Sequence, residues 1–347
     1  MKFTKAIKEY FKQKGVEIES IVKLGSGLVA DGFLVTYKLA EGKSEILVCR
    51  KLRGRGMSHD YFSDRLGYLL LQHNITKKHP RHVRSRDVVI YGKGKIRSLD
   101  SLDEVFQVLE FAAGESFLTT MNLIGYDFES QKKFLLSLCE YMHEVHRIEP
   151  EGNKKDLYLR HSQDFIGSEV LMDILDVWEP DTLLPIELRV KLFTDLFKLR
   201  EETKLFFDRC RMIHADLHPD NVRVHENGSI SVLDSARSMW GEPIDDLTSM
   251  LANFIYYSLV KDNTREQYKK AYDFLVRTYL NTKGTDDERI NKVARLFLPV
   301  RLLILAHPIF FSGDSQDVKQ SLVNGAISIA KDDEFDLFNP WKYFNLN

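Results

Sequence analysis

The chain has 347 residues, of which 44% are hydrophobic and 29% are charged, so it is long enough to bury a large core. A formal net charge of -2 excludes a general electrostatic attraction to nucleic acid or to membrane surfaces. We expect no signal peptide, because the first 15 residues contain no apolar core run, and no membrane-spanning helix, because no apolar run approaches about 20 residues. Three widely spaced cysteines, Cys49, Cys139 and Cys210, are typical of reduced thiols, so we expect a cytoplasmic protein.

The first part of the chain has the pattern of a small antiparallel sheet with two helices. Apolar residues at helical spacing predict an opening helix at residues 4–14. Runs rich in β-formers follow, and a second helical segment lies between the third and the fourth run. The expected strands cover residues 18–24, 32–39, 45–52, 87–91 and 105–111, and the expected helix covers residues 58–73.

The second part of the chain is mainly helical by its periodicity, and one strand-rich segment, residues 212–234, interrupts the helices. A small sheet followed by many helices predicts an α+β fold with two lobes, residues 1–113 and 114–347. The expected helices lie near residues 128–146, 163–177, 186–206, 246–260, 265–281, 286–305 and 316–331.

The segment that starts at His214 carries the strongest sign of chemistry. It reads His-Ala-Asp-Leu-His-Pro-Asp-Asn, and two alternating apolar runs follow on either side of an Asn-Gly pair, which is a hairpin signal. The hairpin would return Asn221 to the side of Asp234, with Asp216 on the loop that enters it. Mg²⁺ prefers carboxylate, amide and phosphate oxygens, and a carboxylate without metal can accept the proton of an attacking hydroxyl. Protein kinases divide these tasks between an Asp base and an Asn and Asp that hold the metal. An ordinary hairpin with solvated acids is the alternative interpretation.

The full string, with the Gly-Glu-Pro-Ile-Asp-Asp-Leu segment at residues 241–247, resembles the signature of the aminoglycoside phosphotransferase and choline kinase-like family, which has a bilobal protein-kinase-like fold. The resemblance implies a small-molecule kinase. Such an enzyme moves the γ-phosphate of ATP or GTP, with Mg²⁺, to a hydroxyl of an aminoglycoside, amino alcohol or sugar. It also implies that Asp216 is the catalytic base and that Asn221 and Asp234 are the metal ligands.

Other residues of this region have expected roles that are not catalytic. By resemblance, His214 would brace the loop and Asp246 would tie the following helix to it. We expect His218 to be a packed loop residue, because it has no partner at metal-ligand spacing. For Arg237 two interpretations stay open: contact with a phosphate or anionic substrate, or an ion pair with an acid such as Asp245.

The nucleotide side is expected in the first lobe. The Gly25-Ser26-Gly27 segment joins two expected strands, and glycines let a backbone approach phosphates closely. Arg50 lies on the third strand at the place of the Lys in the kinase Val-Ala-Ile-Lys pattern. The resemblance to family members with Arg there favours Arg50 as the phosphate-pairing cation and makes Lys51 an exposed neighbour.

Two further nucleotide contacts are expected. The partner of the strand cation would be an acid on the next helix, where Asp64 stands at the family's position and Asp60 is the second choice. The fifth strand resembles the hinge between kinase lobes, so the backbone of Glu110 and of Ala112 would hydrogen-bond a purine edge. A plain buried strand is the alternative.

Two rival functions remain at this point. A regulated protein kinase is disfavoured, because Ala215 replaces the Arg of His-Arg-Asp and the chain after Asp234 is too short for an activation loop. A catalytically inactive, nucleotide-binding pseudokinase or scaffold is disfavoured, because Asp216, Asn221 and Asp234 are all present. We expect a small-molecule hydroxyl acceptor as the partner, no nucleic acid and no membrane; the sequence leaves the oligomeric state open.

Overall fold

The computed structural model describes residues 2–26, 30–53, 62–91, 104–167, 170–235, 238–281 and 287–344. The chain divides into two compact units, Met1–Ala113 (unit 1) and Gly114–Asn347 (unit 2).

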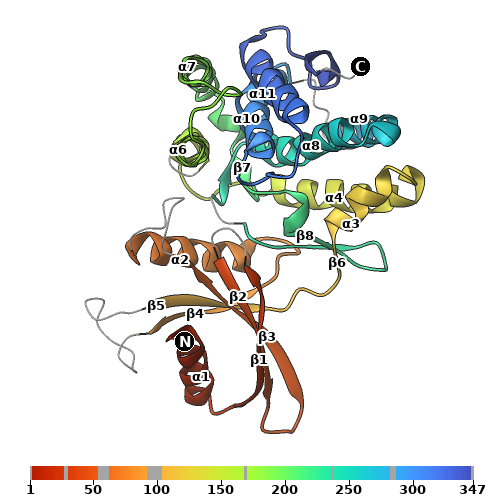
Figure 1. Cartoon of the computed structure of the whole chain (residues 1–347). Helices are drawn as coiled ribbons and strands as arrows, with labels where there is room; N and C mark the ends of the chain where they lie inside the picture. Colours follow the sequence, from red (N-terminus) through yellow and green to blue (C-terminus); the bar gives the residue numbers. More distant parts are fainter. Residues whose placement is uncertain are drawn as a thin grey trace. The chain divides into compact units, whose positions relative to one another are not determined.

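Unit 1 is a five-stranded antiparallel sheet with a helix packed on each face (Figure 1). The strand order is β1-β2-β3-β5-β4, and all five strands expected from the sequence are present. The elements are α1 (Lys2–Gln13), β1 (Glu17–Ser26), β2 (Ala30–Lys38), β3 (Ser44–Leu52), α2 (Phe62–Lys78), β4 (Ser85–Tyr91) and β5 (Glu104–Glu110).

The two faces of this sheet follow from the alternation of side chains along its strands. On one face, Phe3, Ile7 and Phe11 of α1 pack with a buried cluster that includes Cys49 of β3. On the other face, Leu52 of the same strand packs against α2. The face that carries Leu52 also carries Arg50, because the two side chains are two residues apart.

Unit 2 is helical around short strands (Figure 1). Its strands form a three-stranded sheet in the order β6-β8-β9 and a separate pair, β7 with β10. The elements are β6 (Glu115–Ser116), α3 (Phe117–Ile124), α4 (Phe128–His146), α5 (Lys154–Ile166), α6 (Leu171–Val177), α7 (Ile186–Thr203), η2 (Phe207–Arg209), β7 (Arg211–Met212), η3 (Pro219–Asn221), β8 (Val222–Val224), β9 (Ile230–Val232), β10 (Trp240–Gly241), α8 (Pro243–Val260), η4 (Asp262–Thr264), α9 (Arg265–Asn281), α10 (Arg289–Ala306), α11 (Gln316–Lys331) and η5 (Pro340–Tyr343).

Two helix predictions were wrong in detail. The single helix expected at residues 163–177 is two helices, because α5 ends at Ile166 and Gly167 follows at its C-cap. The sequence reading also missed α3, which has only eight residues. Ser116 caps α3 by accepting the backbone N–H of Leu118, a local signal that short periodic patterns do not reveal.

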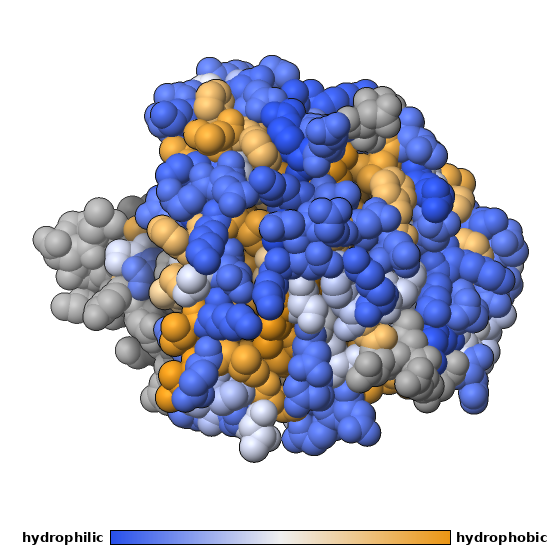
Figure 2. Space-filling model, turned by 90° about the horizontal axis from the view of Figure 1, so that it is seen from above, coloured by the Kyte–Doolittle hydropathy of each residue, from blue (hydrophilic) through white to orange (hydrophobic). Residues whose placement is uncertain are grey.

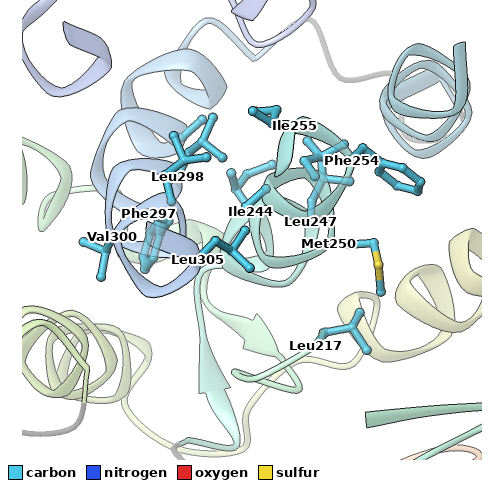
Figure 3. Close-up of a cluster of buried hydrophobic side chains, with 14 of the residues drawn as sticks. Leu217, Ile244, Leu247, Met250, Phe254, Ile255, Phe297, Leu298, Val300 and Leu305 are labelled. Atoms are coloured by element: carbon cyan, nitrogen blue, oxygen red, sulfur yellow. The ribbon is translucent and has the colours of Figure 1, made fainter. Parts of the chain in front are cut away.

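The packing of α8 against α10 forms the centre of unit 2. In Figure 3 the side chains of Ile244 on α8 and of Leu298 and Leu305 on α10 lie between the two helices. These side chains are almost completely buried. The rigid pair of helices is the frame on which the polar residues at the start of α8 are held.

The face of the molecule seen in Figure 2 is mostly hydrophilic, with apolar groups between the polar ones. Three apolar side chains of α7, those of Ile186, Val190 and Phe197, are among the exposed large hydrophobic residues of the chain. In the part of the chain that the structure describes, every helix is too short or too polar to cross a bilayer.

An ion-pair network ties the start of α8 to the residues before α10. Arg209 donates to both carboxylate oxygens of Glu242, at 2.9 and 2.7 Å, and to Asp287 at 2.5 Å. Arg289 donates to the same Asp287 carboxylate at 2.8 and 2.9 Å. The hydrogen bonds from Arg289, and further those from Arg209, lower the pKa of Asp287 to about 2.

The lowered pKa of Asp287 gives a pH-dependent stability. The stabilisation is fully present above the ordinary pKa of the carboxyl group and is lost as the pH falls from about 4 to about 2. Relative to Asp287→Asn, the wild type should lose about 2 kcal/mol of unfolding free energy between pH 6 and pH 2.5, as urea denaturation would measure. The exposed Asp317→Asn variant is the control, and an equal loss in all three proteins would contradict this role of Asp287.

Candidate active site

The hairpin predicted in unit 2 is present and holds two of the predicted residues. β8 and β9 pair antiparallel, with Val222 opposite Val232. The backbone N–H of Leu233 donates to the carbonyl of Asn221 at 2.8 Å. The ends of the two strands therefore keep Asn221 beside Leu233, and Asp234 is the next residue along the chain.

Asn221 is oriented by the loop that carries the predicted base. Its Nδ2 donates to the backbone carbonyl of Asp216 at 2.9 Å, so the other side-chain atom is the oxygen, which Mg²⁺ prefers. Among the described residues, no three His, Cys, Asp or Glu side chains form a group that could hold a metal ion. The amide and carboxylate oxygens of Asn221 and Asp234 fit a hard cation that takes its other ligands from phosphate and water.

Asp246 fixes the backbone of the loop. Its two carboxylate oxygens accept the N–H groups of His214 and Ala215, each at 2.8 Å, and His146 Nε2 lies 3.0 Å from one of them. Burial, together with the charge of Asp245, raises the pKa of Asp246, although these donors favour the charged form. The predicted role of Asp246 as a link between the helix and the loop is confirmed.

His214 links the loop to the hairpin. Its Nδ1 accepts the backbone N–H of Asp216 at 3.3 Å, so the proton lies on Nε2, which donates to the carbonyl of Leu233 at 2.7 Å. The ring is completely buried. Because both ring nitrogens are engaged, His214 is a bracing residue, as the sequence predicted, and not a second base.

Two residues of the site have strained backbones. Ala215 has a φ of 65° and Asp234 a φ of 56°, both in the left-handed region that residues with a Cβ rarely adopt. Such conformations persist only where the surrounding structure imposes them, and they cluster at functional sites. One of them directly precedes Asp216, and the other is a predicted metal ligand.

Asp216 contacts a buried arginine that the sequence reading missed. Arg301 on α10 donates from Nη1 to Asp216 Oδ1 at 3.2 Å, and the Asp216 side chain is 18% exposed. On the other side, His218 Nε2 lies 3.9 Å from Asp216 Oδ2. His218 is not packed as predicted, because its side chain is 37% exposed. The available signal for Arg301 was a charged residue inside the apolar run of α10, which demands a buried partner.

Behind this contact lies a second buried carboxylate. Asp245 accepts from Arg301 Nη2 at 2.7 Å and from His161 Nε2 at 3.1 Å. Burial raises the pKa of Asp245, but the positive charge of Arg301 and the contact with His161 outweigh burial, so the net shift is downward. Arg237, one proposed partner of Asp245, lies outside the described residues.

In unit 1, side chains that pair across four strands form an apolar row. Val22, Leu34, Val48 and Leu109 are successive partners in β1, β2, β3 and β5, so they share one face of the sheet. All four are partly or largely exposed. A flat, exposed apolar surface of this kind suits the face of a purine ring.

The next row on the same face is polar. Gly25 pairs with Gly32, Gly32 with Arg50, and Arg50 with Gln107. Among the described residues, a Cβ added to Gly32 would meet only Leu24, at 3.9 Å. Two glycines beside a cation offer the backbone access that a phosphate needs.

The structure places the other predicted nucleotide residues as follows. Arg50 Nη1 donates to Gln72 Oε1 of α2 at 3.2 Å, a partner that the sequence reading missed, and the pairing of Arg50 with Asp64 stays a prediction. Ser26 lies at the end of β1 opposite Asp31. Gly27 and Asp60 lie outside the described residues.

At the end of β5 the backbone limits how a purine could bind. The Glu110 N–H donates to the carbonyl of Arg84 at 3.0 Å, so it is not the donor of a purine contact. The contacts that stay compatible with the predicted hinge are the carbonyl of Glu110 and the N–H of Ala112.

Comparison with known proteins supports the predicted family and the predicted fold. The sequence model of the phosphotransferase enzyme family matches residues 81–284, more than half of the chain. No protein with a curated description matches the sequence. The match confirms the resemblance seen in the sequence and the enzyme class predicted from it, a small-molecule kinase.

Solved structures show the same fold at low identity. Amicoumacin kinase hAmiN, in complex with AMP-PNP, Ca²⁺ and Ami, is 16% identical with a TM-score of 0.54, covering 96% of this chain and 98% of that chain. A thermostable mutant of aminoglycoside phosphotransferase APH(4)-Ia, in complex with ADP and hygromycin B, is 14% identical with a TM-score of 0.52, covering 94% and 98%. Aminoglycoside phosphotransferase APH(3'')-Id from Streptomyces rimosus is 13% identical with a TM-score of 0.52, covering 85% and 96%. The predicted bilobal α+β fold is confirmed.

Gly241 offers a test of the packing behind the site. A Cβ at Gly241 would lie 2.4 Å from the His161 ring and 2.6 Å from Ile213 Cδ1, and His161 is stacked on Phe297 and has no room to move. Gly241→Ala should therefore lower the unfolding free energy by about 1–3 kcal/mol, measured by urea denaturation. Gly313→Ala, where no described atom lies within 4 Å of the added Cβ, should change it by less than about 0.5 kcal/mol. Equal effects of the two substitutions would refute this account.

Proposed function

Because the chain belongs to the phosphotransferase enzyme family, we propose that it transfers the γ-phosphoryl group of Mg-ATP or Mg-GTP to a hydroxyl of a small molecule. The observation that carries the proposal is the environment of Asp216. Its carboxylate lies on a strained loop, with Oδ1 held by Arg301 and with the predicted metal ligand Asn221 bonded to its backbone.

Unit 2 would supply the base and the metal ligands. Asp216 would orient the acceptor hydroxyl and take its proton, and Asn221 and Asp234 would hold Mg²⁺ through amide and carboxylate oxygens. When bound, Mg²⁺ neutralises negative charge on the phosphates. The protein's own contribution is positioning, which Asp246 and His214 supply through the loop backbone.

Unit 1 would hold the nucleotide. The apolar row from Val22 to Leu109 would carry the purine, whose edge would meet the Glu110 carbonyl and the Ala112 N–H. The row with Gly25, Gly32 and Arg50 would receive the phosphates, and the guanidinium offers a fork that matches phosphate oxygens. Asp64 stays the proposed acid near this row.

The acceptor is proposed to be a hydroxyl compound that also carries an amine. The chain after residue 113 is net acidic. Within unit 2, Tyr256 donates to Asp314 at 2.9 Å, and the rings of Tyr257 and Phe311 lie next to it, each partly exposed. Aromatic faces with a nearby carboxylate attract cations. The partners named for similar structures, hygromycin B and Ami, belong to those proteins. The buried, free cysteines fit the reducing cytoplasm as the compartment.

The first experiment tests Asp216. Release of nucleoside diphosphate from Mg-ATP and Mg-GTP would be measured with a panel of aminoglycosides, amino alcohols and sugars. Asp216→Asn should lower acceptor-stimulated kcat by about 10²–10⁴-fold, because the amide cannot accept the proton. Glu226→Gln, an exposed residue of the hairpin, is the matched control and should keep kcat.

The other outcomes of this assay separate the alternatives. Tight Mg-nucleotide binding without turnover, for every acceptor, would favour the inactive pseudokinase or scaffold. Neither binding nor turnover would mean that the assignment of both units is wrong.

A second experiment tests the polar row of unit 1. Arg50→Met should weaken Mg-nucleotide binding by about 10–100-fold, because a charge-assisted hydrogen bond contributes about 1.5–3 kcal/mol. Isothermal titration would measure the Kd. Lys51→Met is the matched control, since Lys51 points to the opposite face, over the ring of Phe3. Equal losses in both variants would show only a general effect of positive charge.

A further inference from the structure

Arg301 is an unusual residue for its place in the chain. It is 3% exposed in the middle of α10, among buried Leu, Val and Phe side chains. It lies beyond residues 81–284, which match the family, so the family signature assigns it nothing. Burying a guanidinium is costly unless its partners are well placed.

Its hydrogen-bond partners belong to the loop that carries Asp216 or to Asp245, the carboxylate behind that loop. Nη1 donates to Asp216 Oδ1 at 3.2 Å, and Nη2 donates to the Ala215 carbonyl at 3.0 Å. Nε and Nη2 donate to Asp245 Oδ1 at 3.1 and 2.7 Å. The face of the guanidinium lies over the ring of Phe165, 5.2 Å from its centroid. The side chain is therefore fixed in position by five separate contacts.

The contact with Ala215 explains how a strained residue is held in place. The N–H of Ala215 is bound by Asp246, and its carbonyl is bound by Arg301. Both ends of the residue with a φ of 65° are therefore fixed by buried charged groups. These two contacts therefore also fix the backbone direction of the next residue, Asp216.

Stability alone does not account for this arrangement. Replacing a buried ion-pair network by apolar residues of similar volume is often neutral or stabilising. The same helix contains a second buried arginine, Arg295, which donates to the carbonyls of Ile329 and Ala330 and to Asp333. Arg295 therefore ties α10 to the end of α11, whereas Arg301 is directed to the predicted base.

We propose that Arg301 is a positioning residue for Asp216: by holding Oδ1 it fixes the direction in which the carboxylate meets the acceptor hydroxyl. Oδ2 is the oxygen that faces the partly exposed His218, at 3.9 Å. The assignment rests on the proposed function, because it presupposes that Asp216 acts as the base.

The charged groups around Asp216 come from α10 and from its own loop. Arg301 reaches it from α10 and His218 from its own loop, while Asp245 and His161 lie behind Arg301. Loss of the guanidinium would remove the donor that holds Oδ1, so the direction of the carboxylate would no longer be fixed.

The experiment compares Arg301→Met, Arg301→Lys and the matched control Arg295→Met in the full chain. Arg301→Met should lower kcat by about 10²-fold, the size expected for a displaced catalytic group, with the KM for nucleotide within about twofold of wild type. Arg301→Lys should restore part of kcat, because a lysine can still donate to Oδ1. Arg295→Met should lower the thermal unfolding temperature but keep the wild-type kcat and KM.

The results that would overturn the assignment are distinct from failure of the proposed function. A folded Arg301→Met enzyme with wild-type kcat would show that the arginine is only structural. The same conclusion follows if Arg295→Met lowers kcat equally. If Arg301→Met does not fold, Arg301→Lys decides, and a wild-type kcat with reduced stability would refute positioning. Absence of turnover in the wild type with every acceptor would instead reject the proposed function, and this assignment with it.

Discussion

A buried carboxylate, that of Asp246, holds the backbone of the loop on which the predicted chemistry depends. It accepts the N–H groups of His214 and Ala215 and lies against His146, with no exposure to solvent. A charge in this environment is stable only if donors surround it, and the two N–H groups are donors whose position fixes the chain. The loop therefore cannot relax the strained Ala215 without leaving this carboxylate short of partners.

The apolar packing of α8 and α10 supplies the rigidity that this arrangement requires. Side chains such as Ile244 and Leu305 fill the space between the helices (Figure 3). The same pair of helices brings Asp245 into contact with Arg301. Hydrophobic burial stabilises the pair of helices. The charged groups held by these helices therefore keep a fixed geometry, which solvent-exposed side chains would not. The polar network is thus positioned by the core and adds specificity to it.

Local signals in the sequence predicted the parts of the fold that local interactions determine. The alternating runs and the Asn-Gly pair gave the hairpin beside Asn221, and period-two runs gave the five strands of unit 1. Arg301 was missed because its partner Asp216 is 85 positions away, and only the packing of α10 brings them together. Gln72 was missed for a different reason. The kinase pattern predicts an acid as the partner of Arg50, but a neutral amide also accepts a hydrogen bond from a guanidinium.

In unit 1 the strand register determines which side chains share a face of the sheet. Shifting the pairing by one residue would turn Arg50 and the apolar row to the face covered by α1, so the register itself is a functional constraint. Gly32 stands beside Arg50 in the row that is proposed to receive the phosphates. Gln72 accepts a hydrogen bond from the guanidinium of Arg50 and so helps to orient it. In both units, a buried polar partner fixes the direction of a charged group that the proposed reaction would use.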